Sequence, residues 1–244
     1  MISHVFRAEN LKLKRSFLLY LHVIVLFLYP IMMALYLGGR KRIISPDRII
    51  TVYFDILALA TPIIISIVIS LVYDREEKAG HFKNWLSESI EKQRLIQLQL
   101  DYYYFLYIIE IVGMSLIFYG FIFAFYQVNT ISCLKFLLTV LGFALLGFCQ
   151  YEIAELFALK WGTGGCLILG FFGTVITFLG PTVLLDWIWP ILPWAWQIRL
   201  NTFWQNGISD SLIKITLAEY LLPLILTNII IRLALRYFKK WQGK

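Results

Sequence analysis

Two apolar segments of the chain are separated by the stretch Asp74-Arg75-Glu76-Glu77-Lys78-Ala79-Gly80-His81-Phe82-Lys83-Asn84-Trp85, and mixed acidic and basic side chains continue from it to Arg94. The segments on both sides are apolar enough to lie in lipid. A charged segment between two membrane helices is typical of a site where a partner protein docks. The alternative interpretation is a solvated loop. In either case the flanking apolar segments decide the fold.

The composition places the chain among membrane proteins. Of its 244 residues, 60% are hydrophobic and 15% are charged, whereas soluble domains have about 45–50% apolar and about 25% charged residues. The net charge of +7 comes from Lys and Arg at the ends of apolar segments, where they set topology and contact anionic lipid headgroups. The sequence therefore predicts an all-α integral membrane protein and no nucleic-acid partner.

Six apolar runs are long enough to cross a membrane, since a helix of about 20 residues spans about 30 Å of hydrocarbon. Residues 1–16 place apolar side chains at helical spacing among Arg and Lys, which predicts an amphipathic helix at the interface. The first run is longer than a signal-peptide core and lacks a convincing cleavage site, so we expect it to be retained. Residues 1–244 are predicted to form one transmembrane domain, with spans at about 17–37, 49–73, 102–126, 134–159, 164–185 and 215–235.

The distribution of Lys and Arg predicts the orientation. Residues 1–16, 74–94 and 232–244 together hold more of these bases than the segments on the opposite side. The positive-inside bias therefore predicts that both termini are cytoplasmic in a multi-pass protein of the cell membrane. The cluster Arg40-Lys41-Arg42 opposes this bias. In this orientation 74–94 is cytoplasmic and the segment 186–214 faces outward.

Several kinds of chemistry are excluded by missing motifs. The sequence has no GxxxxGKS/T phosphate-binding loop, no nucleophile elbow and no kinase signature. Its three cysteines and three histidines are scattered without metal-ligand spacing, so no metal site is expected. The pair Glu76-Glu77 suggests a membrane protease only if later helices supply an intramembrane His or Asn, and none stands out. The chain is not expected to be an enzyme.

Three carboxylates within the predicted spans are candidates for function: Glu110 in the third, and Glu152 and Glu155 in the fourth. An intramembrane carboxylate is costly unless it is protonated, paired or facing water, so each is a candidate functional residue. Glu152 and Glu155 are three residues apart and share a helix face. The alternative for this pair is a position close to the headgroups at the cytoplasmic end. Glu110 lies deeper and is harder to explain in that way.

The segment 186–214 is rich in Trp and Pro. One interpretation is an aromatic belt that anchors re-entrant or interfacial helices. The other is an outer surface that handles amphipathic or lipid-associated molecules. The residues that would contact such a substrate are Trp187, Trp189, Trp194, Trp196 and Trp204.

The six-span architecture, the amphipathic start and the polar stretch together resemble ABC-2 type permeases. More narrowly, the chain looks like the lantibiotic immunity permeases of Gram-positive bacteria, of the nisin, epidermin and mutacin type. In those proteins a segment of the form E-x-x-x-G-x-F, called the E-loop, lies between spans two and three. Glu76, Gly80 and Phe82 match this form. The match is short, although the architecture covers the whole chain.

This resemblance implies a function and a set of partners. The chain would be the permease subunit of an ATP-driven exporter that expels an antimicrobial peptide from the cell membrane and so gives self-immunity. No cofactor is expected on this chain, since ATP and Mg²⁺ would bind a cytoplasmic ATPase dimer. A second six-span permease, either a different chain or a copy, would complete the transporter. The E-loop would dock on the ATPase as a coupling helix through Asp74, Arg75, Glu76, Glu77, Gly80 and Phe82.

The other hypothesis is a self-contained membrane protein. It would be either a proton-coupled carrier that uses Glu110, Glu152 and Glu155, or a non-transporting immunity factor. Charge reversal at Glu76 and Glu77 should abolish ATPase association and resistance in an exporter permease. In a carrier, replacing Glu110 by Gln should remove activity while changes at 76–77 are tolerated.

Overall fold

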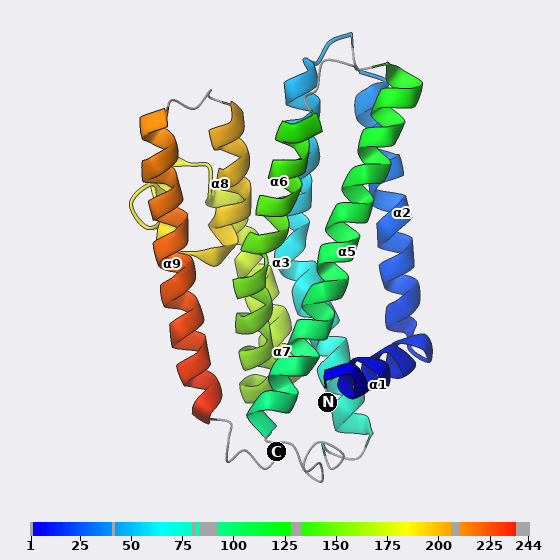
Figure 1. The fold of residues 1–244 in the computed structure, drawn as a ribbon, viewed down its shortest axis with the longest axis vertical. Coiled ribbons are helices and arrows are strands. Elements are labelled where there is room, and N and C mark those ends of the chain that lie inside the picture. Colours follow the sequence, from blue (N-terminus) through cyan, green and yellow to red (C-terminus); the bar gives the residue numbers. More distant parts are fainter. Residues whose placement is uncertain are drawn as a thin grey trace.

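The computed structural model describes residues 2–40, 42–79, 82, 92–127, 133–205 and 210–237, and within these ranges every regular element is helical. Figure 1 shows long helices packed side by side, with α1 lying across one end of the bundle. The elements are α1 (Ile2–Lys14), α2 (Phe17–Gly38), α3 (Pro46–Lys78), α5 (Lys92–Tyr126), α6 (Cys133–Leu146), α7 (Phe148–Leu179), the 3-10 turns η1 (Val183–Leu185) and η2 (Trp189–Ile191), α8 (Pro193–Gln205) and α9 (Asp210–Tyr237).

Capping residues fix where α2 and α3 begin. The Ser16 side chain accepts a hydrogen bond from the Leu18 backbone N–H at 3.1 Å, which ends α1 and starts α2 in a new direction. Ser45 caps α3 in the same way, with Pro46 in the first turn of the helix. Serine at the N-cap satisfies a backbone donor that has no partner inside the helix, and proline has no such donor at the next position.

The helices on either side of the polar stretch are longer than predicted. α3 continues to Lys78 instead of ending near 73, and α5 begins at Lys92 instead of 102. The first residues of the polar stretch are therefore the last turn of α3. In this turn Lys78 pairs with Asp74 at 2.7 Å, in the favourable i, i+4 spacing. Residues 83–91 lie outside the described ranges.

The region predicted as spans 134–159 and 164–185 contains two interruptions. Gly147 separates α6 from α7, and Gly162 inside α7 has φ 74° and ψ −167°. Beyond Gly162, Thr163 lies at Ser70 of α3 and Gly173 at Pro62. The second part of α7 therefore runs antiparallel to α3, and the predicted break at 160–163 corresponds to Gly162. α7 ends at Leu179 rather than near 185.

Four helical segments of the described chain are long and apolar enough to cross a membrane: Phe17–Gly38, Pro46–Lys78, Lys92–Tyr126 and Cys133–Leu179. Many of their large apolar side chains point outward, which suits contact with lipid. Members on α2 include Phe17, Tyr20, Phe27, Leu28 and Met32. These observations fit an all-α membrane protein. The predicted count of six spans goes beyond these four segments and remains a prediction. The start of α1 and the end of α9 lie at the same end of the bundle (Figure 1).

The core is built around α3. On one side the Tyr53 ring stacks on Phe118 of α5, with ring centroids 4.0 Å apart. On the other side α7 packs closely because it presents glycines: a Cβ at Gly170 would lie 2.6 Å from the Ser66 side chain, and one at Gly173 would lie 2.9 Å from the Pro62 side chain. Small residues allow such close approach between helices in a membrane. α3 is thereby fixed between α5 and α7.

Candidate functional site

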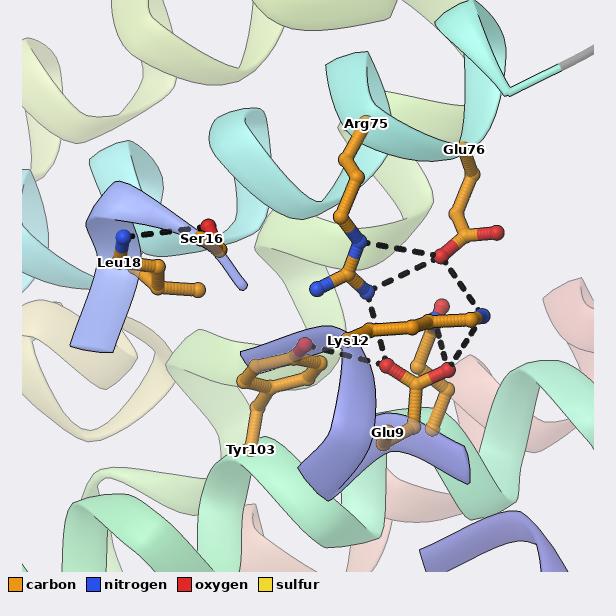
Figure 2. A network of polar contacts seen from close by, with 8 residues as sticks. Glu9, Lys12, Ser16, Leu18, Arg75, Glu76 and Tyr103 are labelled. Carbon is orange, nitrogen blue, oxygen red and sulfur yellow. Dashed lines mark hydrogen bonds and ion pairs between the residues drawn. The ribbon is translucent and has the colours of Figure 1, made fainter. Parts of the chain in front are cut away.

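A buried polar network joins α1, α3 and α5 at one end of the bundle (Figure 2), and Glu9 of α1 lies at its centre. Glu9 is only 3% exposed. One of its carboxylate oxygens accepts hydrogen bonds from Lys12 Nζ at 2.8 Å and Gln99 Nε2 at 3.0 Å. The other accepts from Arg75 Nη2 at 2.8 Å and Tyr103 Oη at 3.1 Å. All three helices therefore meet at one carboxylate.

Glu76 of α3 is the second carboxylate of the network, and it is also only 3% exposed. Its Oε1 accepts from Lys12 Nζ at 2.9 Å and from Arg75 Nη2 at 3.0 Å. Lys12 and Arg75 each bridge Glu9 to Glu76, so two positive charges offset two negative ones. Buried charges are tolerated when they are paired and hydrogen-bonded in this way. The network therefore locks α1 onto the end of α3.

The ionised form of Glu9 is stabilised by its neighbours. Burial alone raises the pKa of this carboxyl group, but the charges of Lys12 and Arg75 and the hydrogen bonds from Lys12 and Gln99 outweigh that effect. The net result is a pKa below the ordinary value for glutamic acid. Opposite charges and donors directed at the charged form both act in this direction.

The residues of the predicted E-loop occupy different environments. Arg75 and Glu76 belong to the buried network, and Phe82 is 3% exposed with its ring 5.0 Å from that of Tyr73. Phe82 has φ 60°, and its N–H donates to the Glu76 carbonyl at 3.3 Å.

The other residues of the predicted E-loop are less buried or not described. Asp74 and Glu77 are half-buried at the end of α3, and Gly80 lies outside the described residues. The predicted docking of this segment on a partner stays a prediction, but Glu76 and Phe82 face their own protein.

The predicted pair Glu152 and Glu155 is buried in α7, and its two members meet different neighbours. Glu155 interacts electrostatically with Glu9 and Glu76, so it lies near the network. Glu152 instead interacts electrostatically with Arg232 of α9 and Asp101 of α5. Its Oε2 is buried without a hydrogen-bond partner among the described residues. The shared helix face therefore does not make a shared site.

Glu110 lies farther along α5 and is paired with a histidine. Its Oε1 forms a hydrogen bond with His22 Nδ1 in the second turn of α2. The carboxylate is on the wall of a cavity between α2, α3 and α5. This pair is separate from the network around Glu9. Within the described ranges, no three His, Cys, Asp or Glu side chains are grouped as a metal site would need.

The Trp-rich segment is mostly folded into the protein. Trp196 is fully buried, and its Nε1 donates to the Pro190 carbonyl at 3.0 Å. Trp189 is buried against Tyr220, with ring centroids 5.2 Å apart. Trp194 is half-buried beside Gly173. Only Trp187, 81% exposed, presents a large free surface among the described tryptophans of the segment, and the side chain of Trp204 is not described. Burial leaves Trp189 and Trp196 no face for a substrate, so among the described side chains Trp187 and Trp194 are the remaining candidates for the predicted outer contact.

Sequence reasoning missed Glu9 and His22 as site residues. Glu9 is the one acid in the basic helix α1, and a lone carboxylate on the apolar side of such a helix indicates a buried ion pair. His22 is a titratable side chain in an apolar run, at a depth where polar residues need a partner. Both signals were present, but the partners lie 66 and 88 positions away.

No protein-family model matches the chain, and searches of curated proteins and of solved structures find no match.

Proposed function

We propose that the chain is the six-span permease subunit of an ATP-driven exporter and that the network around Glu9 makes the E-loop part of the transmembrane unit. The observation that carries this proposal is the double bridge from Glu76 through Lys12 and Arg75 to Glu9. A partner that moves the end of α3 must also move α1, because breaking buried ion pairs is costly. The network thus provides a mechanical connection from a docking segment to the helices.

The proposed partners are a cytoplasmic ATPase dimer, which holds ATP and Mg²⁺, and a second permease chain. The proposed substrate is an antimicrobial peptide expelled from a bacterial cell membrane, which would give immunity to the producing cell. Resemblance of the segment Glu76 to Phe82 to the E-loop supports this choice. Trp187, which is highly exposed, is a candidate contact for the peptide.

The structure sharpens the test of docking. Charge reversal at Glu76 would disrupt the buried network of this chain, so loss of a partner would be ambiguous. Glu77 is half-buried and Lys78 is exposed in the same turn, which makes Glu77→Lys the better variant. Arg48→Glu is a matched control, since Arg48 is exposed at the opposite end of the same helix.

The experiment is purification of the tagged full-length chain from its native membrane in mild detergent, followed by identification of co-purifying proteins. We expect a Walker-motif ATPase with the wild type and with Arg48→Glu, and much less with Glu77→Lys. A chain that purifies alone and stays active in ATP-depleted vesicles would refute the proposal.

A second function is favoured by one observation, the pairing of Glu110 with His22 inside the bundle. A proton-coupled carrier needs titratable groups at such a depth. In that case Glu110→Gln removes transport, and Glu77→Lys has no effect.

A further inference from the structure

The cavity between α2, α3 and α5 has a volume of about 260 Å³. Its inner wall consists of buried side chains, among them Leu57, Tyr107 and Ile111. Its outer wall is α2, where Leu28 and Met32 are 53% and 59% exposed. In a membrane these two side chains face lipid. A ligand dissolved in the bilayer can therefore reach the cavity by passing between α2 and its neighbours.

Glu110 supplies a carboxyl group to the wall of this apolar cavity. No Lys or Arg is among the described residues that line it. His22 Nδ1 forms a hydrogen bond with one carboxylate oxygen of Glu110, and His22 is not among the residues that line the cavity. Its other ring nitrogen, Nε2, is buried with no hydrogen-bond partner in the described structure. The hydrogen bond from His22 orients the Glu110 carboxylate.

We propose that the cavity binds a small lipophilic cation, an amine or quaternary ammonium carrying one aromatic or short alkyl group. The apolar walls suit the hydrocarbon part, and Glu110 attracts the charge in surroundings of low dielectric constant. The rings of Tyr29 and Tyr107, both in the lining, add the aromatic faces that favour ammonium groups. The ligand is distinct from the peptide substrate of the proposed exporter. The cavity volume of about 260 Å³ is below the usual volume of pockets that bind even drug-sized ligands, about 300–1,000 Å³.

The test is equilibrium binding of benzyltrimethylammonium to the purified full-length chain, without ATP or any partner. We expect saturable binding that Glu110→Gln weakens by about tenfold or more, as expected for loss of one charged partner in a buried site. Glu152→Gln removes another buried carboxylate, outside the cavity lining, and should leave binding unchanged. Neopentylbenzene has the same shape without the charge, and it should compete equally well in the wild type and in Glu110→Gln.

A second variant tests the location without changing any charge. Ala60 lines the cavity, and Ala60→Phe fills it, so this variant should abolish binding while remaining monodisperse on size exclusion. Equal affinity of wild type and Glu110→Gln for benzyltrimethylammonium would overturn cation recognition. Full binding by Ala60→Phe would overturn the site. Neither result bears on ATPase association, so failure here is distinguishable from failure of the proposed function.

Discussion

Replacing Glu9 by Gln tests whether the buried network holds α1 in place. The substitution keeps the size of the side chain but removes its charge, and the new amide NH₂ faces donors where an oxygen accepted two hydrogen bonds. Lys12 and Arg75 then share the single carboxylate of Glu76. Removing one partner of a buried ion pair costs about 3–5 kcal/mol. Because the Lys12 side chain is 35% exposed and partly screened by solvent, we expect about 3 kcal/mol, at the low end of this range.

Amide hydrogen exchange measures this loss where it occurs. Local opening of α1 should become roughly a hundredfold more frequent in Glu9→Gln, since each 1.4 kcal/mol corresponds to about tenfold. Exchange in the core of α3 should change much less. Lys14→Gln is the control, because Lys14 lies on α1 but is exposed, and it should shift stability by less than about 0.5 kcal/mol. If Glu9→Gln exchanged like Lys14→Gln, the network would not be what docks α1.

Three further predictions follow from the same structure, each checked by thermal unfolding in detergent. Because the pKa of Glu9 is lowered in the folded protein, its ionised carboxylate contributes stability above pH 4.5, the ordinary pKa of the group, and this contribution is lost as the pH falls through the lower pKa of the folded state. Acid should therefore destabilise Glu9→Gln less than the wild type. An unchanged dependence of stability on pH would contradict this. Gly162→Ala should cost roughly 1–3 kcal/mol because φ 74° with ψ −167° is a region for glycine alone, whereas Gly164→Ala, with open space around it, should be near neutral. Trp196→Ala should cost about 3–5 kcal/mol as a fully buried aromatic, while Trp187→Ala should leave stability unchanged, and equal losses would mean that Trp187 also packs.

The apolar runs predicted the helical class and some element boundaries because a membrane helix is specified by local composition. The start of α2 at Phe17 and the end of α5 at Tyr126 agree with the predicted limits. The ends next to the polar stretch disagree because charged residues mark where lipid ends, not where a helix ends. Asp74 to Lys78 form the last turn of α3 and contain an i, i+4 side-chain pair, which a hydropathy criterion does not detect.

The candidate sites were harder to predict because they depend on contacts between distant parts of the chain. The sequence identifies Glu76 and Glu110 as costly or unusual charges, but not which residue contacts each one. Glu76 was expected to face a partner, and the structure buries it against Lys12 and Arg75. No partner was predicted for Glu110, and the structure places His22 beside it. Such pairings are fixed by how the helices pack, which a single sequence does not reveal.

α5 connects the network to the cavity. Gln99 and Tyr103 bind Glu9, and Tyr107 and Glu110 line the cavity. Their spacings of four, four and three residues place all four on one face of the helix. Gln99 and Glu110 are about 16 Å apart along the axis, at 1.5 Å per residue. Over so few turns a helix moves as a unit, so a displacement of α1 that carries Gln99 and Tyr103 with it also shifts the cavity wall. This connection bears on the proposed exporter and on the proposed cation site, because a docked partner would act at the Glu9 end and a bound cation would act at Glu110.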